Sequence, residues 1–366
     1  MNSRPLGVMK QVQRKMYIDV LKSIAILCMV EVHISAELAP ANISKNSFLA
    51  LIVASIGGLA APLFITLSGW GVHHSLTNKM KNNTNKYNII YWMISRSTFL
   101  LFCQLIVNLI ANHVFEWYTP GVLSLLAICT ILSVPLSKIS THKKIILLSL
   151  LFFTPISNSI FFNMNGNWNF IINADNPSEW FERLIFNGTY PLFPWITFFI
   201  LGSILHEASA SLNKKITLIG FSISLFFIIY AFITNTEWAL TTGDALLTFF
   251  PASIAFIITA NTTVLITFIF LEKYESKFQK NPFVESFSKI GNLSLTIYLL
   301  HFIPLRILAE LGLENWDIIE AVIITILFTI IWWPLSIIHN KRFKKYSIES
   351  LLRWFSATKN IPKPSV

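Results

Sequence analysis

Charged residues are scarce in this chain, and their scarcity excludes an ordinary soluble fold. Only 13% of the 366 residues are Asp, Glu, Lys or Arg, whereas 54% are hydrophobic. Soluble globular chains carry about 25% charged residues, and so apolar a chain is expected in a lipid bilayer. The composition therefore predicts an integral membrane protein, with the lipid bilayer as its first partner.

Cysteines are few, and several motif classes are missing. Cys28, Cys103 and Cys129 all lie inside apolar runs, where buried thiols are expected rather than disulfides or metal ligands. The sequence has no internal repeat, no Gly-rich phosphate loop, no metal-ligand spacing and no nucleic-acid-binding motif. We therefore expect no metal and no nucleic-acid partner. The first apolar run lacks a small-residue cleavage site after it, so we expect a retained helix rather than a signal peptide.

Long apolar runs are what the sequence has in abundance. A membrane-spanning helix needs about 20 mainly apolar residues. Ten runs qualify: 17–36, 47–76, 87–111, 120–137, 143–161, 189–206, 214–233, 245–271, 286–309 and 317–339. The predicted fold is therefore all-α, a polytopic membrane helix bundle of about ten transmembrane helices. Around the membrane domain (17–339) we expect a cytoplasmic N-terminal segment (1–16) and a basic cytoplasmic tail (340–366) facing anionic lipid.

The distribution of Lys and Arg predicts the orientation, because cytoplasmic loops of membrane proteins are enriched in both. With the N-terminus inside, the outer loops hold only Lys45 and Arg183 against ten carboxylates, and the inner segments are rich in Lys and Arg. Both termini are therefore predicted to be cytoplasmic. The long outer loop 162–188 is rich in Asn, aromatic and acidic residues. It suits either an amphipathic cap over the helix ends or a sugar-binding segment in which Trp168 and Trp180 stack on pyranose rings.

The first apolar helix carries ionisable side chains that a plain anchor lacks. A charged group at membrane depth costs about 2.5–3.5 kcal/mol even on insertion scales, which indicates a function. His33, near the outer end, is expected to be a neutral imidazole and thus a candidate general base. Glu37 follows by four residues, shares its helix face and would orient the ring. The alternative is a structural histidine bonded to a neighbouring helix.

Cationic side chains lie nearer the inner surface. Lys22 precedes His33 by eleven residues, or roughly 16 Å along a helix, and Asp19 three residues earlier can pair with it. Arg96 lies inside the third span and is expected to face the bundle interior. Lys22 and Arg96 also fit a simpler role as interfacial anchors. Glu31 cannot share the face of His33, so we expect it to pair with a polar group on another helix.

A second histidine is predicted at a similar depth. His301 lies on the ninth run, which also passes from inside to outside, so His33 and His301 could line one pocket. His73 and His74 are expected at the interface, at the inner end of the second run. Pro191 and Pro194 interrupt the start of the sixth run, and irregular backbone is tolerated in a membrane only against protein or a watery cavity.

Five segments in register resemble the membrane acyltransferase superfamily, which comprises the acyltransferase-3 family and its heparan-α-glucosaminide N-acetyltransferase-like and YeiB-like relatives. The family's first helix has the form L-D-x-L-R-G-I-A, then apolar residues and a histidine, and here it reads IDVLKSIAILCMVEVH. PLFITLSGWG, YPLFPWITFFILGSIL and GNLSLTIYLLHFIP are similar to later family elements, and Arg96 falls where the third helix usually carries arginine.

This resemblance implies an enzyme whose catalytic histidine is His33 and whose donor is acyl-CoA, most commonly acetyl-CoA. The family arginine is Lys22 here, and the glycine after it is Ser23. Lysine keeps the charge but lacks the planar fork that binds phosphate through two bonds. Three consequences stay open: a lower affinity for acyl-CoA, a larger share of donor binding by Arg96, or the use of another acyl carrier. Asp19 would help to position Lys22.

The predicted reaction uses residues from both ends of the first helix. The phosphates of a cytoplasmic acyl-CoA lie near Lys22 and Arg96, and the thioester reaches His33. A hydroxyl or amine of an extracytoplasmic glycan or glycolipid attacks, while His33 takes its proton with help from Glu37 or His301. Transfer through an acyl-histidine stays open. The resemblance also implies a prokaryotic inner membrane.

Two other function classes stay open. A secondary transporter would use buried His and Glu residues as an ion or substrate relay. The lack of a paired repeat or of matched broken helices weighs against it. A non-catalytic assembly or sensor protein is the third possibility. A cation and a base one donor arm apart on the same helix, as Lys22 and His33 are, favour the enzyme.

Overall fold

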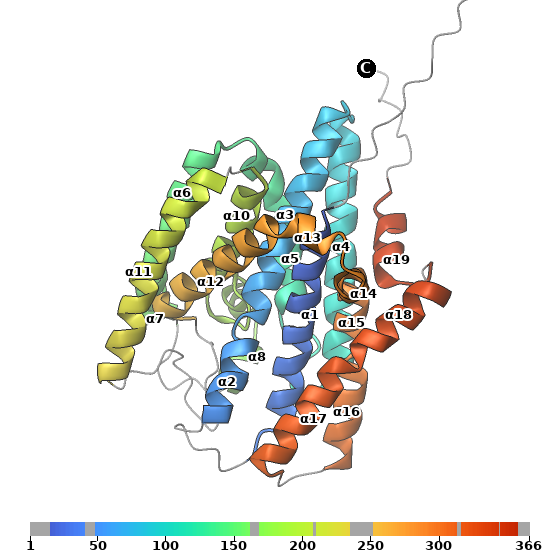
Figure 1. Cartoon of the computed structure of the whole chain (residues 1–366). Helices are drawn as coiled ribbons and strands as arrows, with labels where there is room; N and C mark the ends of the chain where they lie inside the picture. Colours follow the sequence, from blue (N-terminus) through green and yellow to red (C-terminus); the bar gives the residue numbers. More distant parts are fainter. Residues whose placement is uncertain are drawn as a thin grey trace, which may run out of the picture.

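The computed structural model describes residues 15–40, 48–161, 168–207, 210–234, 252–312, 316–343 and 345–357. Every regular element in these ranges is helical (Figure 1). The first half holds α1 (Met16–Glu37), α2 (Phe48–Gly57), α3 (Ala60–Lys81), α4 (Lys86–Ile110), α5 (Val122–Ser137), α6 (Thr141–Leu148), η1 (Ser149–Phe153), α7 (Thr154–Phe161), α8 (Trp168–Ile172), α9 (Pro177–Glu182) and η2 (Arg183–Asn187). The second half holds α10 (Leu192–Glu207), α11 (Ala210–Thr234), α12 (Ile254–Lys273), α13 (Glu275–Phe278), α14 (Pro282–Gly291), α15 (Ser294–Leu300), α16 (Phe302–Leu311), α17 (Ile318–Ile330), α18 (Trp332–Arg342) and α19 (Ile348–Phe355).

The predicted fold class is confirmed, since the protein is an all-α, multi-pass membrane bundle. By length and apolar character, six helices of the described residues can cross a membrane, or seven if a pair bent by 46° at residues 188–191 counts as one span. The number of about ten spans and the cytoplasmic termini stay predictions. Most of the predicted N-terminal segment, the start of the run 245–271 and the end of the predicted tail lie outside the described residues.

α1 lies at the centre of the bundle. It is not one of the six helices counted as possible membrane spans, because it carries too many charged residues. It packs against α14, α3, α17 and α2, so other helices rather than lipid surround most of its surface (Figure 1). Asp19, Ser23 and Glu31 are buried there beside Leu21, Ile26 and other apolar residues. Ionisable residues in membrane proteins face the bundle interior, and the position of α1 satisfies this rule.

Small residues let two helices of the core approach closely, as expected for the second apolar run. α3 and α10 form the most extensive helix pair of the described residues. A Cβ atom added to Gly69 would overlap the carbonyl oxygen of Phe199, and one added to Gly202 would overlap that of Thr66. Glycine therefore permits backbone contact here, which is how helices associate where lipid removes the hydrophobic drive.

Ser23 joins α1 to α14. Its Oγ lies 2.9 Å from the carbonyl oxygens of Asp19 and Phe287, and the backbone N–H of Gly291 donates to Oγ over 2.8 Å. The Ser23 hydroxyl therefore makes contacts with the backbone of both helices. These bonds hold the Lys22 turn of α1 against the helix that leads to His301.

A helix of the predicted basic tail is anchored in the bundle. Glu349 of α19 accepts hydrogen bonds from the backbone N–H groups of Leu295 and Thr296 over 2.7 and 3.1 Å. Its other oxygen accepts from the Thr296 hydroxyl over 2.6 Å. The first N–H groups of a helix have no partner within it. Glu349 thus caps α15 from another helix.

Candidate active site

Two histidines from distant parts of the chain meet beside α1. Nδ1 of His33 lies 2.7 Å from Nε2 of His301, and the two rings stack with centroids 5.0 Å apart and planes 9° apart. His301 lies where α15 ends and α16 begins, and it is fully buried. The two histidines therefore do share one site.

A backbone carbonyl group determines which ring nitrogens of this pair carry protons. Nδ1 of His301 lies 3.0 Å from the carbonyl oxygen of Ile297, which can only accept, so Nδ1 carries the proton. Nε2 of a neutral His301 is then an acceptor, and Nδ1 of His33 must donate to it. Nε2 of His33 keeps its lone pair, so the pair presents a base with its free nitrogen away from His301.

Aromatic rings enclose the pair. The ring centroid of Phe302 lies 4.8 Å from that of His33, and the centroid of Tyr298 lies 6.4 Å away. Phe64 of α3 stacks on Tyr298 with centroids 5.8 Å apart. These rings come from α3, α15 and α16, so the site forms only in the folded bundle. They limit water around His33, whose side chain is only partly buried.

Glu37 does not play the role expected of it. Its carboxylate lies 3.4 Å from Nε2 of His113, beyond the end of α4, while His301 is the residue that orients His33. The prediction that Glu37 orients the His33 ring is therefore wrong. Helix spacing placed Glu37 near His33 correctly, but the side chain points to a different partner. The sequence around His113 gave no indication that this residue contacts Glu37.

Glu31 also differs from the expectation. Both of its carboxylate oxygens are buried and have no hydrogen-bond partner among the described residues. One of them lies near Gly57 of α2, where an added Cβ would come within 3.3 Å. The predicted polar partner on another helix is thus not found in this part of the chain.

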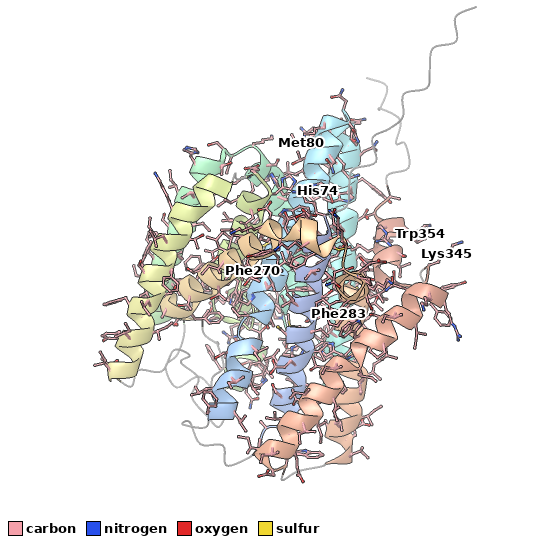
Figure 2. All side chains as sticks on the ribbon, viewed as in Figure 1. His74, Met80, Phe270, Phe283, Lys345 and Trp354 are labelled. Carbon is pink, nitrogen blue, oxygen red and sulfur yellow. The ribbon has the colours of Figure 1, made fainter. Side chains whose placement is uncertain are left out.

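At the other end of α1, Lys22 and Asp19 pair as predicted, with Nζ 4.0 Å from Oδ1. Lys15 lies at the start of α1, Lys22 in its second turn and Lys81 at the end of α3. Trp70 stacks on the His74 ring with centroids 5.0 Å apart, and its own ring lies 5.9 Å below the Lys15 ammonium. Cationic side chains and the Trp70 ring thus occupy one end of the bundle. Figure 2 shows His74 and Met80 toward this end.

The neighbouring His73 connects three helices through a buried polar cluster. Its side chain is buried, and Nε2 lies 2.6 Å from Oε1 of Glu207 at the end of α10. The buried Lys144 donates to the same carboxylate over 2.8 Å. His73 thus joins α3 to α10 and α6, and its position at the membrane interface stays a prediction.

Arg96 lies on α4, which packs against α5, α19, α16 and α15. Its Nε is buried and lacks a hydrogen-bond partner among the described residues. A buried donor without a partner costs about 1–3 kcal/mol, so a bound anion would stabilise this arrangement.

The outer loop 162–188 forms a cap in its described part. The indole N–H groups of Trp168 and Trp180 donate to the carbonyl oxygens of Val114 and Tyr118 over 3.1 and 2.9 Å. Both tryptophans therefore hold the cap onto the segment after α4. Polar residues of α9 and η2 line a pocket next to them.

The family model described as the acyltransferase domain of the acyltransferase-3 family matches residues 16–337. The match runs from the first residue of α1 to the middle of α18, and it includes His33, His301, Lys22 and Arg96. No curated protein matches the chain in a sequence comparison. A match over so much of the chain shows the family, and it agrees with a multi-pass helix bundle. The chain therefore belongs to the acyltransferase-3 family of membrane acyltransferases.

Proposed function

We propose that this acyltransferase moves an acetyl group from cytoplasmic acetyl-CoA to a hydroxyl or amine of an extracytoplasmic glycan or glycolipid, in a cytoplasmic (inner) membrane. The observation that carries the proposal is the His33–His301 pair. Its proton arrangement leaves Nε2 of His33 as a base inside a wall of aromatic rings.

The proposed step uses that free nitrogen. The acceptor oxygen or nitrogen attacks the thioester carbonyl carbon while Nε2 of His33 takes the acceptor proton. The thiolate of CoA leaves and receives this proton from the imidazolium. His301 acts as a positioning residue, because it accepts from Nδ1 of His33 and so stabilises the ring in both protonation states.

The residues at the Lys22 end fit the donor in charge. CoA carries phosphates and an adenine ring, and this end offers Lys15, Lys22 and Lys81 with the Trp70 ring. Arg96 adds a buried donor that has no hydrogen-bond partner in the described part of the chain. The helical rise between Lys22 and His33 is roughly 16 Å, of the order of the arm that links the phosphates to the thioester. We propose Lys22 and Arg96 as donor-binding residues, with Asp19 positioning Lys22.

The test is turnover of radiolabelled acetyl-CoA by the purified full chain, comparing the wild type with His33→Ala. General-base catalysis contributes about 10²–10⁴-fold, so turnover should fall by that factor. Thermal melts in detergent check that the variant is folded. If His33→Ala transfers or hydrolyses acetyl-CoA at the wild-type rate, the assignment of the base is wrong.

One observation keeps secondary transport as the second candidate. Glu31 is a buried carboxylate without a hydrogen-bond partner among the described residues, and ionisable groups buried in membrane bundles mark ion and proton pathways. If the wild type neither binds nor consumes acetyl-CoA or longer acyl-CoA, while Glu31→Gln abolishes proton-coupled uptake in vesicles, transport replaces acyl transfer as the proposed function.

A further inference from the structure

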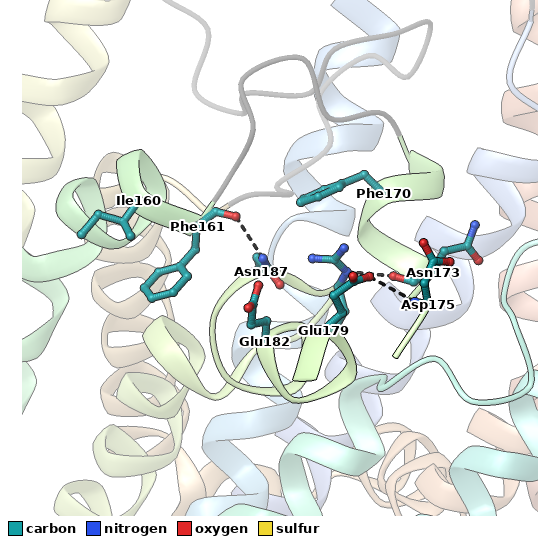
Figure 3. Close-up of a pocket in the computed structure, with 9 residues that line it drawn as sticks. Ile160, Phe161, Phe170, Asn173, Asp175, Glu179, Glu182 and Asn187 are labelled. Carbon is teal, nitrogen blue, oxygen red and sulfur yellow. Dashed lines mark hydrogen bonds between the residues drawn. The ribbon is translucent and has the colours of Figure 1, made fainter. Parts of the chain in front are cut away.

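A polar pocket lies beneath the described part of the outer cap, between α7, α8, α9 and η2 (Figure 3). Its volume is about 680 Å³, within the range of small-molecule sites. Phe161 of α7 and Phe170 of α8 supply aromatic surface, and apart from Ile160 the other lining residues are polar or charged. The pocket is thus built as carbohydrate sites are, from ring faces and hydrogen-bonding groups.

The charge of this pocket is negative. Asp175, Glu179 and Glu182 line it, and Arg183 is the one cation among its lining residues. The Arg183 guanidinium lies 4.0 Å from the centre of the Phe170 ring, and its Nε donates to the Asn173 carbonyl oxygen over 2.9 Å. The guanidinium is therefore engaged by the protein, and the carboxylates outnumber it. An acidic ligand would meet repulsion here.

Asn187 points to a ligand independently of the carboxylates. Its side chain is only 1% exposed, and Nδ2 donates to the Phe161 carbonyl oxygen over 2.9 Å. This bond determines the orientation of the amide, so Oδ1 is directed elsewhere, and it has no hydrogen-bond partner among the described residues. The labelled amide lies beside Phe161 at the pocket (Figure 3). A buried acceptor without a partner fits a ligand that donates hydrogen bonds.

Contacts place the pocket and His33 at the same end of the bundle. Glu37, the last residue of α1, lies 3.4 Å from His113. The segment that follows carries Thr119, whose hydroxyl donates to the Ile172 carbonyl oxygen over 2.9 Å, and Tyr118, which accepts from Trp180. The outer end of α1 and the pocket wall thus rest on one short segment.

We propose that this pocket is the acceptor subsite and that it takes a hydroxyl-rich saccharide bearing an ammonium group, while it rejects acidic saccharides. The inference rests on the proposed acyl transfer to a glycan and adds the charge class of the acceptor. Ammonium and hydroxyl groups donate hydrogen bonds to Asn187 Oδ1 and the carboxylates, and the apolar face of the sugar ring lies against the aromatic wall.

The test measures binding to the full chain in detergent by calorimetry, without acyl donor. Three probes are compared: a glucosamine disaccharide, its N-acetylated form and a disaccharide that contains a uronic acid. The wild type is expected to bind the glucosamine disaccharide at least about tenfold more tightly than the uronic acid probe, a difference of about 1.4 kcal/mol. Glu182→Gln and Asp175→Asn should each lower the affinity for the glucosamine disaccharide by about three- to tenfold. Both variants should leave the affinity for the N-acetylated probe unchanged.

Glu310→Gln is the matched control, because Glu310 lies in α16 and its carboxylate accepts from Arg306 on its own helix. It should bind all three probes as the wild type does. Equal affinity for the three probes, no binding of any of them, or unchanged affinity in both pocket variants overturns the proposal. His33→Ala should bind saccharide normally while losing transfer, so a failed pocket and a failed acyltransferase give different results.

Discussion

At the scale of single residues, a backbone carbonyl determines which atom can do chemistry. The carbonyl oxygen of Ile297 requires a proton on Nδ1 of His301, and this in turn requires the proton of His33 on Nδ1. Nε2 of His33 is left as the base. A neutral histidine here has the orienting role that a carboxylate has in many other sites, which suits a buried position because no charge needs to be buried.

His301 can be tested as a positioning residue. His301→Leu removes the acceptor for Nδ1 of His33 and should lower kcat by about 10–100-fold, with little change in the KM for acetyl-CoA. His301→Gln offers an amide oxygen to the same N–H and should recover part of the loss. A purely structural role predicts that both variants lose thermal stability and activity in parallel, so melts accompany the kinetics.

Lys22 allows the departure from the family arginine to be measured. Lys22→Ala should raise the KM for acetyl-CoA about tenfold and change kcat little, since a charge near the phosphates is lost far from His33. Lys22→Arg restores the planar fork and should give a KM at or below that of the wild type. A KM that is unchanged in Lys22→Ala would show that Lys22 does not contact the donor.

At the scale of helices, the core depends on backbone contact between α3 and α10. Gly69 and Gly202 face the carbonyl oxygens of Phe199 and Thr66, so no side chain fits between the two helices. The His73–Glu207–Lys144 cluster then joins the same helices and α6 at the opposite end from His33. This rigid pair carries Trp70 and Phe64, which contribute to the two ends of the proposed site.

Gly69→Val should force α3 and α10 apart and lower the melting temperature in detergent or abolish expression of folded protein, because overpacking typically costs about 1–3 kcal/mol or more. Gly71→Ala is the matched control, since an added Cβ at Gly71 meets nothing within 4 Å. It should leave the melt unchanged or raise it slightly. A Gly69→Val melt equal to that of Gly71→Ala would contradict the close packing.

At the scale of the whole molecule, α19, in the C-terminal part of the sequence, supports the site. α19 packs against α4 and α15, and Glu349 caps the helix that ends at His301. α1 and the helices from α14 to α16 come from opposite ends of the sequence but lie side by side (Figure 1). The histidine pair thus requires that both halves of the bundle are assembled.

Glu349→Gln removes the charge of the cap and Glu349→Ala removes the cap itself. Losing a helix cap costs about 0.5–2 kcal/mol, so Glu349→Ala should melt at a lower temperature and have a reduced kcat through His301. Arg353→Ala, on the same helix, is the control because Arg353 is exposed and bonds within α19 to Ser350. Equal behaviour of the two alanine variants would show that α19 does not support the site.

Much of this architecture could be read from the amino acids alone. Apolar runs of about 20 residues predict helices regardless of their neighbours, because in lipid a helix satisfies its own backbone hydrogen bonds. The helical character of the predicted runs is therefore found in the described residues, although several runs, such as 47–76 and 286–309, are divided into two or three helices. His33 stands out because ionisable groups in such runs are costly. The match of the family model agrees with the resemblance seen in α1, α3, α10 and α15.

Pairings between helices could not be read in the same way. Helical periodicity gives the face on which a side chain lies, but which helix meets that face depends on packing among all of them. Glu37 contacts His113, Ser23 contacts Gly291 and Glu349 contacts α15. The partners are about 50 to more than 250 residues apart in the sequence, and His113 lies beyond the end of α4. Local sequence sets the depth of each group in the membrane, whereas its partner is chosen by close packing and by the need of each buried polar group for a hydrogen bond.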